Sequence, residues 1–91
     1  MGSFPASDFG VLFDGTAALP WERWLPRNAE FPVNGRSHRS QLSSVPACQR
    51  IVKRAIVKRL QEAYRTENLP ETGPRGAIEI SLREDVVTLT L

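Results

Sequence analysis

The feature that most constrains the fold is an amphipathic stretch from about Val45 to Arg65. Its apolar residues recur at helical spacing and form one stripe, which comprises Cys48, Ile51, Val52, Ala55, Ile56, Leu60 and Ala63. Such a stripe is typical of an α-helix that packs on a core. Ser44 can cap this helix, and Pro46 is compatible with its first turn. The sequence therefore predicts one long helix covering the rest of the domain.

One cation interrupts the stripe. With 3.6 residues per turn, Arg59 falls near the middle of the apolar side, whereas Arg54 lies on the open side. A guanidinium in that position has to snorkel to solvent, pair with an acid or reach a ligand. We expect a half-buried Arg59 held by an acid or by backbone carbonyls, and we expect its loss to destabilise the fold more than the loss of Arg54.

Shorter elements precede this helix. Ser7 or Asp8 can cap a first helix, in which Phe9, Leu12, Phe13 and Ala17 recur at helical spacing. The segment 19–26 (LPWERWLP) reads as one tight helical turn, and its two tryptophans are more typical of core cover than of base stacking. Residues 30–33 suggest a short edge strand or bulge because Pro32 lies within it.

The next residues are expected to be irregular, and the end of the chain is expected to form strands. Asn34-Gly35 predicts a turn, and the polar segment 36–44 predicts a loop. Residues 78–82 and 86–91 alternate apolar and polar side chains around a short turn, which predicts a β-hairpin. The fold class is therefore α/β (α+β): a single small domain over residues 1–91, with helices packed on a short mixed sheet that ends in a hairpin. Because the last strand reaches Leu91, we expect an engineered boundary or a longer parent protein.

Charge is concentrated in one part of the chain. Between Arg36 and Arg65, eight Lys and Arg residues face a single acid, Glu62, so this segment carries +7 and the remainder carries −5 of the net +2. Concentrated positive charge suits a polyanion, because each neutralised phosphate releases counterions. A solvated helix face is the plainer alternative, and we favour nucleic acid.

Catalysis and metal binding find little support in the residue types. His38 and Cys48 are the one His and the one Cys, whereas a zinc site needs about four ligands. Cys48 lies on the apolar stripe, which favours a packed core cysteine over a nucleophile. We find no complete active site, no apolar run long enough to cross a membrane and no export leader, and we expect a cytoplasmic setting.

The candidate binding residues lie in the segment 36–41 and on the polar side of the long helix. They are Arg36, Ser37, His38, Arg39, Gln41, Arg50, Lys53 and Arg54. Guanidinium groups, hydroxyls and the N–H groups of a helix N-terminus are the groups that bind phosphate. Since Arg36, Arg39 and Lys53 do not lie on the apolar stripe, we expect that replacing these three with alanine keeps the fold.

Several segments resemble a known family. They are residues 19–26 (LPWERWLP), 31–37 (FPVNGRS), 40–57 (SQLSSVPACQRIVKRAIV) and 70–73 (PETG). These segments are similar to the THUMP region of bacterial class I methyltransferases that modify guanine N2 in large-subunit ribosomal RNA, a group also labelled N6-adenine-specific DNA methylases. The resemblance covers about Phe4 to Leu91, and we expect the strand that precedes the first helix in the family to be missing here or reduced to Phe4-Pro5.

The resemblance implies an RNA-binding module that presents substrate RNA, ribosomal RNA in particular, to a methyltransferase domain in the same protein. That domain would bind S-adenosylmethionine; its glycine-rich cofactor motif and its Asn/Asp-Pro-Pro motif are absent from these 91 residues. We therefore expect no enzyme activity and no cofactor in this chain. Two alternatives stay open, namely a protein-interaction or assembly module and the DNA-binding part of a DNA methylase.

Overall fold

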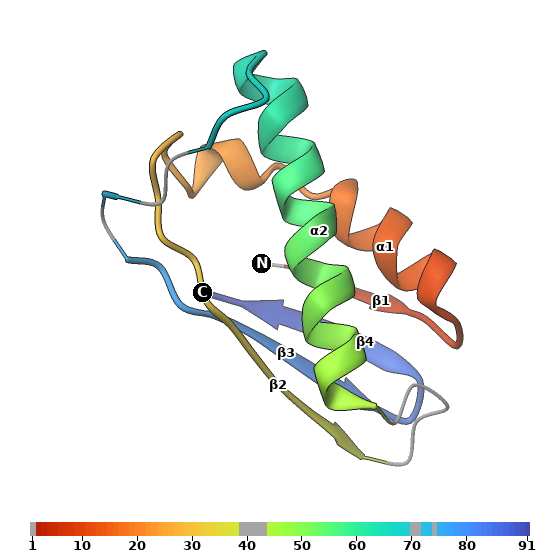
Figure 1. Cartoon of the computed structure of the whole chain (residues 1–91). Helices are drawn as coiled ribbons and strands as arrows, with labels where there is room; N and C mark the ends of the chain where they lie inside the picture. Colours follow the sequence, from red (N-terminus) through yellow and green to blue (C-terminus); the bar gives the residue numbers. More distant parts are fainter. Residues whose placement is uncertain (1, 39–43, 70–71, 74) are drawn as a thin grey trace.

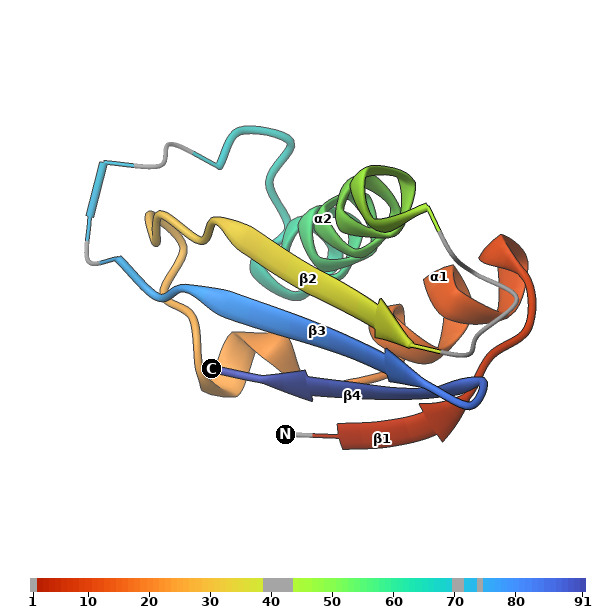
Figure 2. The ribbon, with the colours of Figure 1, turned by 90° about the horizontal axis from the view of Figure 1, so that it is seen from below.

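A computed structural model of the chain describes residues 2–38, 44–69, 72–73 and 75–91. In chain order its elements are β1 (Gly2–Pro5), α1 (Phe9–Ala17), the short 3₁₀ helix η1 (Trp21–Arg23), β2 (Val33–His38), α2 (Val45–Tyr64), β3 (Ile78–Arg83) and β4 (Val86–Thr90). The strands form one sheet in the order β1-β4-β3-β2, and α1 and α2 cover the same face of it (Figure 1, Figure 2). The expected α+β architecture with a C-terminal hairpin is confirmed.

Helix α2 forms where its periodicity predicts. Ser44 occupies the N-cap position, although its side chain makes no capping hydrogen bond, and Arg65 ends the helix in a left-handed conformation with φ 52°. The stripe residues that are fully buried are Cys48, Val52, Ala55, Ile56 and Leu60. Ile51 is half-buried, and Ala63 is exposed beside Arg59, so the apolar stripe ends one turn earlier than expected.

Helix α1 and the short helix η1 contribute further residues to the core. The Asp8 side chain accepts a hydrogen bond of 2.8 Å from the Val11 N–H, which confirms it as the cap of α1. Leu12 is buried as expected, but Phe9 is 42% exposed. Trp21 is fully buried, and its indole N–H donates to the Thr16 carbonyl at 2.7 Å. The core interpretation is thus confirmed for this tryptophan.

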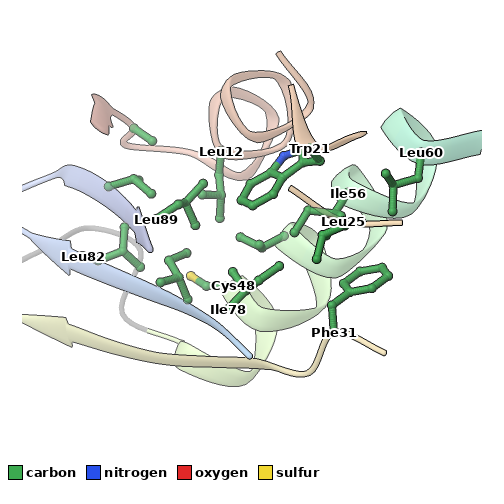
Figure 3. Close-up of a cluster of buried hydrophobic side chains, with 14 of the residues drawn as sticks. Leu12, Trp21, Leu25, Phe31, Cys48, Ile56, Leu60, Ile78, Leu82 and Leu89 are labelled. Atoms are coloured by element: carbon green, nitrogen blue, oxygen red, sulfur yellow. The ribbon is translucent and has the colours of Figure 1, made fainter. Parts of the chain in front are cut away.

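The core fills the space between the helices and the sheet. Side chains from α1, η1, α2, β3 and β4 meet there, as Figure 3 shows for Leu12, Trp21, Leu25, Phe31, Cys48, Ile56, Leu60, Ile78, Leu82 and Leu89. Cys48 is fully buried within this cluster, and that burial raises the pKa of its thiol. The expectation of a packed core cysteine is confirmed.

The N-terminal strand is longer than the sequence suggested. β1 begins at Gly2 rather than Phe4 and pairs antiparallel with β4, with Phe4 opposite Val87. A side chain at Gly15 of α1 would collide with the Phe4 ring, so the glycine lets helix and strand pack closely. At the other hairpin, Glu84 and Asp85 form the turn with φ of 51° and 64°.

The largest departure from expectation concerns β2. The strand expected at residues 30–33 starts only at Val33, and the predicted turn at Asn34-Gly35 and loop at 36–38 are instead part of it. It pairs in parallel with β3, with Val33 opposite Ile78 and His38 opposite Arg83. β2 is nevertheless an edge strand, as Pro32 suggested.

The sequence does not predict β2 as a strand because its inner side carries small residues in place of large apolar ones. At Gly35 an added Cβ would lie 2.6 Å from Ile80 Cγ2 and 3.5 Å from Val45 Cγ1. The glycine therefore lets the first turn of α2 approach the sheet. Since the strand lacks an apolar alternation of its own, the period-two signal is absent from its sequence.

Candidate nucleic-acid interface

The exposed side of the N-terminal half of α2 carries the most concentrated positive charge. Arg50 and Arg54 lie one turn apart and are exposed, and Lys53 beside them is half-buried. The sequence from Ser44 to Gln61 contains no Asp or Glu. We call Arg50, Lys53 and Arg54 the basic strip. It holds three of the eight predicted binding residues together on one surface.

The basic strip borders the edge strand. Lys53 Nζ donates to the Phe31 carbonyl at 3.0 Å and lies 3.8 Å from the centre of the Phe31 ring. Gln49 Nε2 donates to the Val33 carbonyl at 3.1 Å. Between helix and strand lies an open depression of about 550 Å³, lined by Val33, Pro46, Gln49, Arg50, Lys53 and Arg54. Lys53 thus ties α2 to the segment that precedes β2, which the sequence did not indicate.

Three other predicted residues lie on β2, not on a loop. Side chains alternate along a strand, so Arg36 and His38 are exposed on the face of the sheet opposite α2, while Ser37 points inward and is half-buried. The continuous loop-and-helix surface that the sequence suggested is therefore split by the edge of the sheet. Arg39 and Gln41 lie outside the described residues.

Sequence reasoning missed Arg83. It lies at the end of β3, is exposed, and is directly opposite His38. The alternation of residues 78–82 places position 83 on the polar face of the sheet, so this signal was present. Its neighbours could not be read from the sequence, because they depend on the parallel pairing with β2.

The C-terminal half of α2 is tied to η1 by an ion pair. Arg59 Nε and Nη2 donate to the two carboxylate oxygens of Glu22 at 3.0 and 2.7 Å, and Nη1 reaches the Ala17 carbonyl at 3.5 Å. Tyr64 Oη lies 2.6 Å from the Leu25 carbonyl oxygen, to which it donates. We call Glu22, Arg59 and Tyr64 the clasp. The expectation that an acid holds a half-buried Arg59 is confirmed, with 32% of its side chain exposed.

The clasp shifts the ionisation of both partners. The hydrogen bond from Arg59, followed by backbone hydrogen bonding, lowers the pKa of Glu22 to about 2. The same hydrogen bond raises the pKa of Arg59. Both groups are therefore charged at neutral pH, and the guanidinium of Arg59 is engaged within the fold.

Within the described residues, no group of three His, Cys, Asp or Glu side chains could hold a metal ion. Neither α1 nor α2 is long and apolar enough to cross a membrane, and the same holds for every helix in the described part of the chain.

A mixed four-stranded sheet with two helices on one face defines a small α+β module, and exposed cations lie on α2 and on the open face of the sheet. The sequence matches the model of the family described as "THUMP domain" over residues 6–91. The chain therefore belongs to the THUMP domain family.

Its relatives are longer proteins. The chain is 45% identical over 93 residues to the "Putative RNA methyltransferase YpsC" of Bacillus subtilis, covering 100% of this chain and 24% of that protein. A crystal structure of "a predicted N6-adenine-specific DNA methylase" from Listeria monocytogenes is 52% identical, with TM-score 0.93, over 97% of this chain and 23% of that one. A structure of "a putative methyltransferase complexed with SAH" is 44% identical, with TM-score 0.94, over 97% and 24%. The chain thus spans about a quarter of the length of these relatives.

Proposed function

We propose that this chain is the RNA-binding module of a longer methyltransferase and that it positions substrate RNA, ribosomal RNA in particular, for a catalytic domain outside these 91 residues. The observation that carries the proposal is the basic strip, because Arg50 and Arg54 are exposed on a helix face whose sequence is free of acids. Membership of the THUMP family and the relative described as an RNA methyltransferase support RNA as the polyanion.

The mechanism is positioning. Arg50 and Arg54 would bind phosphates through their guanidinium groups, while Lys53, fixed against Phe31, adds charge at the base of the strip. Arg36 and His38 would extend the contact to the opposite face of β2, and the half-buried Ser37 between them would contribute its hydroxyl group. Arg39 and Gln41, which lie outside the described residues, remain predicted contacts. Phosphate contacts set the register of the RNA, and the catalytic domain selects the base.

S-adenosylmethionine would bind to that catalytic domain. The relative whose structure contains SAH supports this assignment for the longer protein. We expect no cofactor binding by the present chain, because no cofactor-binding motif is found in its sequence. Calorimetric titration checks this expectation, and stoichiometric binding of S-adenosylmethionine would contradict it.

The test is a titration with a fluorescently labelled, structured RNA at two salt concentrations. We expect Arg50→Gln/Arg54→Gln to bind about tenfold more weakly at the lower salt concentration, with a log–log salt slope flatter by about one unit per lost contact. Arg23→Gln/Arg27→Gln is the matched control, since it removes two exposed arginines near η1. Equal affinities for the two double variants would contradict the proposal.

DNA is the second candidate, because one relative is described as a DNA methylase. A competition assay separates the two nucleic acids. RNA binding predicts that structured RNA displaces the probe at lower concentration than duplex DNA of the same sequence, and the reverse order would favour DNA. A protein-assembly module would bind neither at either salt concentration.

A further inference from the structure

The helices leave one face of the sheet uncovered (Figure 2). Its exposed or half-exposed polar side chains are Ser3, Asn34, Arg36, His38, Glu79, Ser81, Arg83, Thr88 and Thr90, and the exposed apolar residues Pro5 and Val86 lie at one end of the same face. The pairing aligns them in rows across the strands, and the middle row consists of Arg36, Ser81, Thr88 and Ser3. Cations lie toward the β2 side, and hydroxyl groups lie toward β1.

Two cations on this face are placed to share one ligand. Arg36 is opposite Ser81, and Arg83 is two residues further along β3, so strand spacing and rise put their Cα atoms about 8 Å apart. Neither guanidinium makes an ion pair or hydrogen bond with another described residue. Each can therefore turn toward a group held between them.

The surface is hollowed between these two arginines. A depression of about 450 Å³ is lined by Arg36, Ser37, His38, Ser81, Leu82 and Arg83, none of which is acidic. The acids of the adjoining turn, Glu84 and Asp85, do not line it. Guanidinium groups around an acid-free hollow favour an anion of the size of a phosphate group.

A second depression of about 290 Å³ adjoins the first. It shares Arg36 and Ser81 with it and is otherwise lined by Asn34, Gly35, Glu79, Ile80, Thr88 and Thr90. A carboxylate accepts hydrogen bonds, and an amide and hydroxyls both donate and accept them. Such a set suits a sugar that carries hydroxyl groups. The carboxylate of Glu79 would repel a second phosphate.

We propose that the open face of the sheet binds one nucleotide unit of RNA, with its phosphate between Arg36 and Arg83 and its ribose in the adjoining depression, where Glu79 accepts a hydrogen bond from the 2′-hydroxyl. This inference rests on the proposed RNA-binding function and extends it to a second face. The 2′-hydroxyl distinguishes RNA from DNA, so Glu79 would supply selectivity that the basic strip lacks. Because β2 is an edge strand, one RNA molecule can pass around it and reach both faces.

The phosphate position is tested with Arg83→Gln. Arg27→Gln is the matched control, since it also removes one exposed arginine, from the segment after η1. We expect Arg83→Gln to lower the affinity for a labelled structured RNA about fivefold to tenfold and to flatten the salt slope by about one unit, while Arg27→Gln changes neither. The melting temperature of each variant verifies that the fold is intact.

The ribose position is tested with Glu79→Thr, which retains a residue suited to a strand. Removing a negative charge should strengthen binding of RNA and DNA equally if the carboxylate acts only through its charge. If Glu79 accepts from the 2′-hydroxyl, the ratio of RNA affinity to DNA affinity instead falls about tenfold. An unchanged ratio overturns the ribose assignment.

The outcomes separate this inference from the proposed function. If the unaltered chain does not bind RNA, both are overturned. If Arg50→Gln/Arg54→Gln weakens binding and Arg83→Gln does not, the open-face site is overturned while the basic strip stands. Weakening by both variants, together with a lower RNA-to-DNA ratio for Glu79→Thr, supports the two-face interface.

Discussion

The two halves of α2 use the same residue type in different ways. In the N-terminal half, Arg50 and Arg54 are exposed and face solvent. In the C-terminal half, the Arg59 guanidinium makes two hydrogen bonds to Glu22 and a longer one to the Ala17 carbonyl. An angle of about 140° around the helix axis separates Arg54, which is available to a ligand, from Arg59, which holds the fold together.

The position of each cation relative to the apolar stripe therefore decides its role. A charge on the stripe has to be compensated within the protein, because desolvation without a partner is costly. A charge opposite the stripe keeps its hydration and contributes little to stability. The clasp should therefore affect unfolding, and the basic strip should affect ligand affinity. Four stability measurements test this division.

The largest effect is expected at Trp21, which directly precedes Glu22 of the clasp and is fully buried. Trp21→Ala should lower the free energy of unfolding by about 3–5 kcal/mol, because it removes a large core side chain and leaves a cavity. Trp21→Phe should cost less, since it loses the indole hydrogen bond to Thr16 but keeps most of the packing. Urea denaturation measures both variants. A cost below about 1 kcal/mol for Trp21→Ala would show that the η1 region contributes little to stability.

The next effect concerns the two arginines compared above. Arg59→Ala should destabilise the chain by about 1–2 kcal/mol, between the values for an exposed and a buried ion pair, because Glu22 is left without its partner. Arg54→Ala should change stability by less than about 0.5 kcal/mol. Thermal unfolding monitored by circular dichroism compares the two. Equal melting temperatures would refute the division between the clasp and the basic strip.

The clasp also predicts a dependence on pH. Since the pKa of Glu22 is lowered to about 2 in the fold from an ordinary value of 4.5, the fold favours its ionised form. Its contribution is present above about pH 5 and is lost as the pH falls toward 2. With solvent screening, the loss should be on the order of 1 kcal/mol. The stability difference between the unaltered chain and Glu22→Gln should shrink over this range, and a constant difference would contradict the assignment.

The smallest effect is expected at Lys53, which departs from the simple division. Its ammonium group donates to the Phe31 carbonyl and lies over the Phe31 ring, so Lys53→Ala should cost about 0.5–1 kcal/mol. The sequence led us to expect no loss. Arg50→Ala, on the exposed side, is the matched control and should be neutral. Identical unfolding curves for the two variants would show that Lys53 does not contribute to stability.

Much of the fold could be predicted wherever the signal was local. The stripe of α2, the Asp8 cap, the tight turn around Trp21 and the alternation in β3 and β4 each depend on neighbours within a few residues. The position of Arg59 on the stripe also predicted its partnered state. Its partner, Glu22, lies 37 positions away in the sequence, so local periodicity cannot identify it.

The candidate interface was predicted in its residue types and only partly in its arrangement. Sequence placed Arg50, Lys53 and Arg54 on the polar side of one helix, and the structure brings them together. The sequence placed Arg36 and His38 on a loop beside these three residues, whereas both extend from the face of the sheet opposite α2. Arg83 joined the surface only through the pairing of β2 with β3.

The sequence alone thus determined the long helix, the hairpin and the concentration of charge, because periodicity and composition are properties of contiguous residues. Tertiary structure decided that β2 exists and which way its side chains point. The strand gains its backbone partners from β3, 45 positions away in register, and its inner cover from α2. A strand of small and polar residues has no apolar pattern of its own, so its hydrogen bonds and neighbours, not its sequence, fix the face on which Arg36 lies.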